Sequence, residues 1–473
     1  MTRPNSPRPT TLAALRATGH QYRTVKAEIR ENLLARLAAG EPTLPGIVGF
    51  TDTVVPELER ALLAGHDMVL LGERGQGKTR LIRTLSGLLD EWTPVVEGCE
   101  INDHPYAPAC RRCQQLVAER GGETPVDWLH RDARYGEKLA TPDTSVGDLV
   151  GDIDPIKVAA GRTLGDPETV HYGLVPRTNR GIFSVNELPD LAERIQVALL
   201  NVLEERDIQV RGYSLRLPLD LLLVASANPE DYTNRGRIIT PLKDRFGAEI
   251  RTHYPQELAH EIELIRQEAD LEWPYGPLTQ PLVPDHVVEI LARYTRFVRE
   301  APGVDARSGV SARFAIAATE TVAASAVRRA AITGEEVAVA RVGDLVSVVP
   351  ASRGKVEFDA TEEGREEEIL EHWLRRAVAA TFRSRLAGVD LSGLQDRFDD
   401  GLSVTTGDLV PARELLRQVG TVPGLTRILD RLGDGGSETP ELAAAAVEFV
   451  LEGLYLNRRL AKDELDGKVV YGQ

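Results

Sequence analysis

The feature that most constrains this chain is a glycine-rich stretch, GERGQGKT, at residues 72–79. It directly follows the apolar run MVLL (68–71) and fits the pattern G-x-x-x-x-G-K-[ST], in which a buried strand passes through a loop into a helix. Glycines let the backbone curl around phosphate oxygens, so the amides of the loop and of the helix N-terminus point at the anion. An accidental glycine-rich turn is the alternative, and the strand before and the helix after the loop argue against it.

The pattern therefore predicts that the chain binds Mg·ATP. Lys78 would reach the β- and γ-phosphates, and the Thr79 hydroxyl would ligate Mg²⁺. The residues expected to surround the phosphates are Gly72, Glu73, Arg74, Gly75, Gln76, Gly77, Lys78 and Thr79.

Apolar runs alternate with helical patterns between residues 46 and 255. Strands are expected at 68–71, 94–98, 181–185 and 221–227, and helices at 54–65 and from Lys78 onward. Short apolar runs that alternate with helices indicate a parallel sheet covered on both faces. The segment QVRGYSLRL (209–217) alternates around Arg211-Gly212 and predicts a hairpin that projects from this core.

The rest of the chain predicts helices. Residues 24–39 repeat an apolar residue every four positions and end at Gly40, whereas the proline-rich residues 1–10 suggest a disordered tail. After residue 255 the strand signals fade, a helix is expected near Thr361, and Thr439-Pro440 open another helix after the linker GDGGS (433–437). We therefore expect a tail and helix (1–45), a nucleotide-binding domain (46–255), a helical lid (256–350) and a helical C-terminal region (351–473).

The charge of the chain limits its partners. With 56 basic and 72 acidic residues, the formal net charge is −16. An acidic protein gains nothing from counterion release on nucleic acid, so we do not expect nucleic acid to be its main partner. No apolar stretch approaches the roughly 20 residues needed to cross a bilayer, and the N-terminus has no apolar secretion signal. We therefore expect a cytoplasmic protein without membrane insertion.

Polar residues at later strand and helix ends are candidates for catalysis. The strand at 181–185 is followed by Asn186, which is expected beside the magnesium ion, and then by Glu187, which is placed to polarise the attacking water. Asn228 follows the next strand and could hold the same water or the γ-phosphate. Arg245 in PLKDRFG could reach a neighbouring subunit's site, and Arg313 in GVSARFAIA could return to the γ-phosphate. Each residue alone could be an ordinary turn or surface ion pair; their order after a phosphate loop favours the catalytic interpretation.

These residues resemble a known family, the ATPase subunit of magnesium chelatase and the related MoxR-type AAA+ proteins. The matching motifs are IVGF (47–50), GERGQGKT, EGC (97–99), SVGDLVGDIDP (145–155), NRGIFSVNEL, LLNVLEERDIQVRGYSLRLP, LLVASANPEDY and LKDRFG. The resemblance covers residues 46–255 well, continues more loosely to Arg313, and is weak beyond. It implies an α/β AAA+ fold, with a three-layer αβα core around a parallel sheet, a helical lid and a helical C-terminal region.

The resemblance also implies roles and partners. Lys78 and Thr79 look like the family's phosphate-loop pair, Glu187 like its catalytic acid and Asn228 like its first sensor. Arg245 is similar to the family's arginine finger and Arg313 to its second sensor. A ring is implied, usually hexameric, with ATP held between subunits and a partner that carries a von Willebrand factor A domain.

One position departs from the family pattern. The family usually has Asp before the catalytic Glu, where this chain has Asn186. An Asn can hydrogen-bond a metal-bound water but brings no negative charge to Mg²⁺. We expect weaker Mg²⁺ affinity and slower hydrolysis.

All three cysteines of the chain lie between residues 99 and 113, in a segment that also holds His104. Cys99, His104, Cys110 and Cys113 make an acceptable tetrahedral zinc set, with Cys110 and Cys113 in a C-x-x-C arrangement. The alternative is reduced structural thiols beside a surface histidine. A zinc ion here would stabilise the loop and would have no catalytic role.

Four functions remain open at this stage. The first is a motor that remodels a protein partner, and the second is the chelatase motor for metal insertion into a tetrapyrrole. The third, an ATP-gated scaffold that hydrolyses slowly or not at all, is motivated by Asn186. The fourth, transcription activation, needs a GAFTGA-like loop, and none occurs between Arg80 and Arg180.

Overall fold

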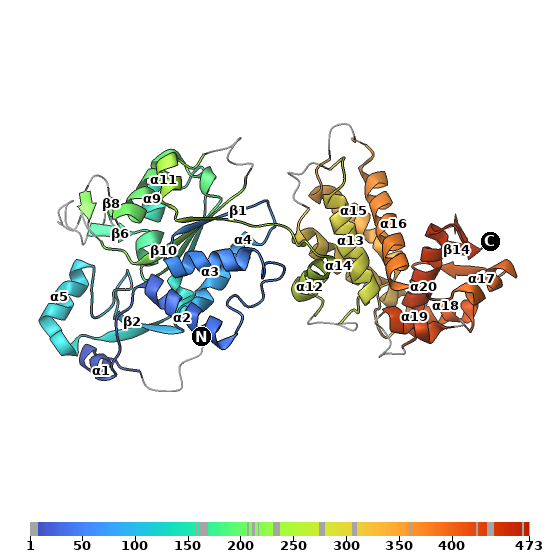
Figure 1. Ribbon diagram of the computed structural model, residues 1–473, viewed down its shortest axis with the longest axis horizontal. Coiled ribbons are helices and arrows are strands. Elements are labelled where there is room, and N and C mark those ends of the chain that lie inside the picture. Colours follow the sequence, from blue (N-terminus) through green and yellow to red (C-terminus); the bar gives the residue numbers. More distant parts are fainter. Residues whose placement is uncertain are drawn as a thin grey trace. The chain divides into compact units, whose positions relative to one another are not determined.

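The computed structural model forms two compact units, Met1–His253 and Tyr254–Gln473 (Figure 1). The residues that the structure describes are 8–154, 156, 159, 169–205, 208–210, 213–215, 217–229, 237–273, 280–304, 310–358, 362, 364–421, 424–432, 439–465 and 468–472.

A parallel sheet organises the first unit. Its five strands lie in the order β11-β1-β10-β7-β4, and each neighbouring pair is parallel. The bounds are Met68–Leu71 for β1, Tyr135–Leu139 for β4, Gly181–Asn186 for β7, Leu221–Ala227 for β10 and Ala248–Arg251 for β11. Strand β10 is buried along its whole length, which explains its continuous apolar run.

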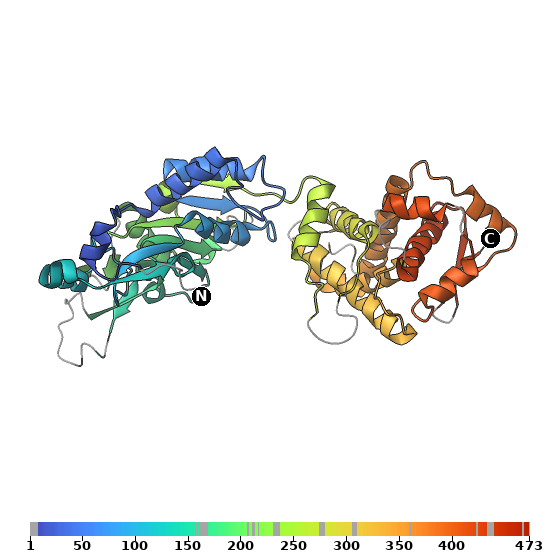
Figure 2. The same ribbon diagram turned by 90° about the horizontal axis from the view of Figure 1, so that it is seen from below.

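Successive residues of β1 point to opposite faces of the sheet, and each face is covered by helices. Met68 and Leu70 pack with α2 (Val25–Ala39), α3 (Val54–Ala64) and α4 (Lys78–Thr84). Val69 and Leu71 pack with α9 (Glu193–Glu205) and with Leu242 of α11 (Thr240–Arg245). Figures 1 and 2 show the sheet between these helix layers, so the predicted three-layer core is confirmed.

Several local predictions are confirmed by the observed caps and pairings. Helix α2 begins after Thr24, whose side chain accepts a hydrogen bond from the Ala27 amide, and it ends at Gly40 in the left-handed conformation. Strands β8 (Ile208–Val210) and β9 (Tyr213–Leu215) pair antiparallel as a hairpin. The turn residues Arg211-Gly212 lie outside the described residues.

The predicted strand at 94–98 is a strand but does not join the main sheet. It corresponds to β2 (Trp92–Val96), which pairs antiparallel with β3 (Val126–His130). Residues 8–10 of the expected tail are also ordered, because Arg8 lies over the Trp92 ring at 4.0 Å and Trp128 Nε1 donates to the Pro9 carbonyl at 2.9 Å. Residues 1–7 lie outside the described residues.

Smaller elements complete the first unit. They are α1 (Leu12–Ala17), η1 (Leu85–Leu88), α5 (Arg111–Arg120), η2 (Gly121–Glu123), η3 (Arg131–Arg134), α6 (Val146–Leu149), β5 (Gly151–Ile153), β6 (Val170–Tyr172), α8 (Leu174–Arg177) and η5 (Leu188–Asp190).

The second unit is mainly helical and has its own apolar core. Its helices are α12 (Leu258–Glu268), α13 (Asp285–Arg299), α14 (Ala312–Thr333), η7 (Val342–Ser347), α15 (Val348–Ser352), η8 (Arg353–Lys355), α16 (Glu366–Arg385), α17 (Ser392–Asp399), α18 (Ala412–Val419), α19 (Leu425–Leu432) and α20 (Pro440–Leu456). Helix α20 is capped by Thr439, as expected, and α16 begins five residues beyond the expected Thr361.

The C-terminal region also contains a sheet that the sequence analysis did not anticipate. Strands β12 (Val404–Thr406), β13 (Ala461–Leu465) and β14 (Lys468–Gly472) pair antiparallel in the order β12-β14-β13. Among the described residues, none of the helices combines the length and apolar character needed to cross a bilayer.

Candidate functional site

The phosphate loop connects β1 to α4 at the carboxyl edge of the sheet. Gly75 and Gly77 adopt φ values of 75° and 74°, in the left-handed region that glycine occupies without strain. Gly72 is required for a different reason. A Cβ atom there would lie 2.0 Å from Thr252 Oγ1 and 2.3 Å from Gln76 Oε1. The loop therefore cannot keep this path with a larger residue at position 72.

The side chain of Gln76 connects the phosphate loop to itself and to Thr252 by hydrogen bonds. Its side-chain Oε1 accepts hydrogen bonds from the Glu73 amide at 3.0 Å and from Thr252 Oγ1 at 2.8 Å. Thr252 follows β11, and its amide donates to the Leu71 carbonyl at 2.9 Å. The curl of the loop is thus fixed by the neighbouring strand before any ligand binds.

Lys78, the first residue of α4, brings its ammonium group back over the loop. Its Nζ donates to the Gly72 carbonyl, to the Glu73 carbonyl at 2.8 Å and to Asn228 Oδ1 at 2.9 Å. Asn228 comes directly after β10, which is the neighbour of β1. The structure therefore brings together the predicted phosphate lysine and the predicted sensor asparagine.

Asn186 is the last residue of β7, on the other side of β10, and it is buried. Its Nδ2 donates to Glu137 Oε1 at 2.7 Å, and its Oδ1 accepts from Ser226 Oγ at 3.2 Å. These two contacts fix which way the amide faces. The oxygen faces β10, and the nitrogen faces the Glu137 carboxylate of β4.

Glu187 follows Asn186 and adopts a left-handed conformation, with φ 57° and ψ 46°. This conformation costs a residue other than glycine about 1–2 kcal/mol. Its amide donates to Ser226 Oγ at 3.3 Å, and its side chain is only half-buried. Backbone strain of this kind concentrates at functional sites, where it aims a side chain.

Glu137 is a site residue that the sequence analysis missed. Its carboxylate accepts hydrogen bonds from Arg83 Nε at 2.8 Å and from the Tyr135 hydroxyl at 3.0 Å, besides the one from Asn186. Partial desolvation opposes ionisation, but the hydrogen bonds from Arg83 and Tyr135 outweigh it and lower the pKa of Glu137. A negative charge therefore lies one hydrogen bond away from the position where the family has Asp.

The remaining predicted residues are Thr79 and Arg74 beside Lys78, Arg245 on α11 and Arg313 on α14. Thr79 is half-buried in the first turn of α4, and Arg74 is exposed on the loop. Arg245 ends α11 on the surface and donates to Glu204 Oε1 at 2.8 Å. Arg313 lies at the start of α14, in the second unit, and is exposed.

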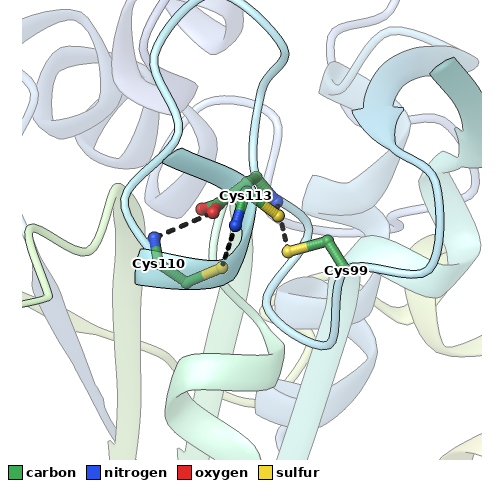
Figure 3. A group of neighbouring side chains, drawn as sticks. Cys99, Cys110 and Cys113 are labelled. Carbon is green, nitrogen blue, oxygen red and sulfur yellow. Dashed lines mark hydrogen bonds between the residues drawn. The ribbon is translucent and has the colours of Figure 1, made fainter. Parts of the chain in front are cut away.

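The three cysteines converge near the start of α5 (Figure 3). The Sγ atoms of Cys99, Cys110 and Cys113 and a carboxylate oxygen of Asp103 all lie within 4.8 Å of one another. His104 is directed elsewhere: its Nε2 meets His20 Nε2 at 3.3 Å, and its Nδ1 accepts from the Tyr106 amide at 3.0 Å. The structure thus brings Asp103, and not the predicted His104, to the cysteines.

The ionisation of this group is strongly coupled. Hydrogen bonds from the Cys110 and Cys113 thiols lower the pKa of Cys99 to about 3. Hydrogen bonds to Cys110 and Cys99 raise the pKa of Cys113 far above its usual value. Burial, and next the charge on Cys99, raises the pKa of Asp103. The raised pKa values of Cys113 and Asp103 mean that the protonated forms of these two groups are favoured, and a bound cation would favour the deprotonated forms instead.

Comparisons with known proteins give one family model and a set of curated relatives. The family model is the sigma-54 interaction domain, which matches residues 163–245. The magnesium-chelatase 38 kDa subunit of Acidiphilium rubrum is 29% identical over 259 residues, covering 53% of this chain and 63% of that subunit. The magnesium-chelatase subunit ChlI of Synechocystis is 30% identical over 254 residues, covering 50% of this chain and 66% of that subunit. The chain thus spans slightly less than two thirds of the length of these relatives.

The comparisons also matched solved structures. The BchI–BchD complex of magnesium chelatase contains a chain 22% identical to this one, with a TM-score of 0.35. That match covers 68% of this chain and 97% of the other chain. NtrX from Brucella abortus in complex with ATP is 15% identical, with a TM-score of 0.40, and the match covers 85% of this chain and 72% of NtrX.

Proposed function

We propose that this chain, an AAA+ protein distantly homologous to the ATPase subunits of magnesium chelatase, binds and hydrolyses Mg·ATP to remodel or activate a protein partner. The observation that carries the proposal is the contact of Lys78 Nζ with Asn228 Oδ1 over the phosphate loop. Asn228 directly follows β10, and Glu187 directly follows the neighbouring strand β7. A lysine, an amide and a carboxylate at the ends of adjacent parallel strands are what phosphoryl transfer to water requires.

The loop residues fit a triphosphate. The Lys78 ammonium now rests on carbonyl and amide oxygens, which phosphate oxygens can replace at equal or better strength because they carry charge. The loop amides and the N-terminus of α4 add partial positive charge at the same place. Thr79 and Asn186 would face the magnesium ion, which neutralises charge on the phosphates when it is bound.

Glu187 would act on the attacking water. Its left-handed backbone turns the side chain out of the strand at the point where β7 ends, and Asn228 on the next strand could hold the same water. Asn186 supplies an amide where the family has a carboxylate. We therefore propose that Mg²⁺ affinity is weak and hydrolysis is slow.

We further propose that the active form is a ring, with Arg245 completing the site of the adjacent subunit. The Arg245 side chain is 38% exposed and is held by exposed carboxylates, among them Glu204. A solvent-exposed ion pair of this kind is weak, so it can be exchanged for a phosphate contact at little cost. Arg313 is proposed as the second sensor from the helical unit.

The partner is proposed from the family resemblance alone. A protein with a von Willebrand factor A domain would be the target of a MoxR-like motor. The names of the relatives point to magnesium chelatase, which makes the insertion of metal into a tetrapyrrole the narrower version of the same proposal. The two versions can be distinguished by trapping the chain with bound ATP and identifying the protein that co-purifies with it.

The direct test compares the parent with Lys78→Ala and Glu187→Gln. Lys78→Ala should lose nucleotide binding in equilibrium titrations, because it removes the phosphate cation. Glu187→Gln should keep binding but lower the steady-state rate of ATP hydrolysis by at least about a hundredfold, the usual contribution of a general base. Unchanged turnover in Glu187→Gln would assign the water to another residue.

The same test separates a motor from a scaffold. If the parent shows no measurable ATP hydrolysis even with a partner added, the chain is an ATP-gated scaffold. In a scaffold, Glu187→Gln should change little. Transcription activation is favoured only by the sigma-54 model match over residues 163–245. The absence of a GAFTGA-like sequence between Arg80 and Arg180 speaks against that function.

A further inference from the structure

The cluster formed by Cys99, Asp103, Cys110 and Cys113, here called the cysteine cluster, lies outside the nucleotide site. In a tetrahedral zinc site with Zn–S bonds of about 2.3 Å, two sulfur ligands are about 3.8 Å apart. The ligand atoms of the cysteine cluster already lie within 4.8 Å of one another. A contraction of about 1 Å, within the reach of side-chain rotation, would bring them to tetrahedral zinc geometry.

The surroundings of Asp103 give the most direct indication that a metal ion binds in the cysteine cluster. The residue is 1% exposed, and its Oδ2 accepts the Cys110 amide at 2.8 Å. Its Oδ1 is buried and has no hydrogen-bond partner among the residues that the structure describes. A buried carboxylate oxygen without a partner is costly, and a metal ion beside it removes that cost.

Backbone amides prepare the sulfurs to act as thiolate ligands. The Asp103 amide donates to Cys99 Sγ at 3.3 Å, and the Cys113 amide donates to Cys110 Sγ at 3.4 Å. Arg112 Nη1 lies 3.9 Å from Cys113 Sγ, and its guanidinium is also held by the carbonyls of Gly98 and Glu97. These donors offset the negative charge that three thiolates and one carboxylate leave on a divalent cation.

We propose that Cys99, Asp103, Cys110 and Cys113 bind one Zn²⁺ ion in a closed structural site. Sulfur-rich ligand sets select zinc over magnesium or calcium. With four protein ligands no coordination position is left for water or substrate, so the ion is structural and not catalytic. This proposal is independent of the proposed ATPase activity.

The ion would fasten the loop between β2 and α5. Asn102 Nδ2, within that loop, donates to the Arg177 carbonyl at 2.7 Å, and Asn179 Nδ2 donates to the Ile101 carbonyl at 2.9 Å. Residues 177–179 shortly precede β7, the strand that ends at Asn186. Zinc would therefore hold the loop against the chain segment that leads into the nucleotide site.

The test is the metal content of the whole chain, produced in zinc-supplied cells and desalted without chelator. We expect about one zinc per chain by inductively coupled plasma mass spectrometry. Replacing zinc by cobalt should give the visible bands of a tetrahedral site, together with a thiolate-to-cobalt charge-transfer band in the near ultraviolet. Chelation should raise hydrogen exchange in residues 97–113.

Matched variants distinguish the residues that bind zinc from residues that only lie near the site. Asp103→Asn keeps an acceptor for the Cys110 amide but loses the charge, so zinc affinity should fall at least about tenfold. Cys110→Ser should also lose zinc. His104→Asn keeps an acceptor for the Tyr106 amide and should retain zinc at the parent level. Retained nucleotide binding in each variant serves as the check that the first unit is folded.

Three results would overturn the proposal. One is less than about half an equivalent of zinc in the parent. Another is loss of zinc in His104→Asn with retention in Asp103→Asn, which would reassign the fourth ligand. The last is an intact mass lighter by two hydrogens, which would show a disulfide in place of a metal site.

Discussion

At the scale of single residues, Asn186 and Glu137 are best understood as a pair. The Asn186 amide donates to Glu137 Oε1 at 2.7 Å, and Arg83 donates to both oxygens of the same carboxylate. An aspartate at position 186 could only accept hydrogen bonds, so two carboxylates would meet at that distance. Their repulsion would raise the pKa of one of them or push the new side chain aside.

We therefore predict that Asn186→Asp alone does not restore the family's magnesium affinity. The double variant Asn186→Asp with Glu137→Gln should do so, because the introduced glutamine amide can donate the hydrogen bond that Asn186 now donates. The double variant should bind Mg²⁺ in the presence of nucleotide about tenfold more tightly than the parent, equivalent to about 1.4 kcal/mol.

Glu137→Gln alone is the control, and its magnesium affinity should stay within about threefold of the parent, or roughly 0.7 kcal/mol. Titration of magnesium against ATPase rate and bound nucleotide measures all three variants. An equal gain in the single and double Asp variants would show that Glu137 does not oppose a charge at position 186.

At the scale of elements, helix α2 is fixed to the rest of its unit by a buried ion pair. Arg134 donates two hydrogen bonds to Glu28 of α2, both at 2.7 Å, and neither side chain is exposed by more than 4%. Removing Glu28 leaves the guanidinium buried without this counter-charge. We predict that Glu28→Ala lowers the free energy of unfolding by about 3–5 kcal/mol.

The comparison variant is Arg251→Ala, which breaks the exposed pair with Glu249 in the same unit. That change should cost less than about 1 kcal/mol. Urea-induced unfolding, followed by far-ultraviolet circular dichroism, compares the two. Similar midpoints for the two variants would contradict the structural role assigned to the Glu28–Arg134 pair.

Elements with a strong apolar signal could be predicted from the sequence, and weaker ones could not. MVLL and LLLVASA are buried on both faces, so their strands stand out as unbroken apolar runs. The edge strands β4 (YGEKL) and β11 (AEIR) contain charged residues that interrupt the apolar run, and the sequence analysis did not predict them. A strand was predicted at 94–98, close to the observed β2 (Trp92–Val96), but its pairing with β3 depends on distant residues that a local pattern does not report.

Some residues of the candidate site could be predicted from the sequence, and others could not. Lys78, Glu187 and Asn228 come shortly after strands whose ends meet at one edge of a parallel sheet, so sequence spacing sufficed to predict that Lys78 and Asn228 belong to one site. Glu137 enters the site from a missed strand. In the cysteine segment, spacing could not decide between Asp103 and His104, because two adjacent residues in a loop point in directions set by tertiary contacts.

At the scale of the whole molecule, the proposal requires more than one copy of the chain. The phosphate loop and Glu187 belong to one compact unit, and Arg245 lies on the surface of the same unit, held by Glu204. In the proposed ring, the exposed Arg245 contributes to phosphoryl transfer at the nucleotide of a neighbouring subunit. In such rings an arginine finger contributes about 10³–10⁵ in rate.

Mixing two inactive variants tests this shared site most directly. Lys78→Ala cannot bind the phosphates but still offers Arg245, whereas Arg245→Ala binds nucleotide but lacks the arginine. In a randomly mixed head-to-tail ring, about one quarter of the interfaces would combine an intact loop with an intact arginine. We predict that each variant alone is inactive and that the equimolar mixture recovers a measurable part of the parent ATPase rate. A mixture no more active than its components, together with Arg245→Ala turning over at the parent rate, would contradict the account.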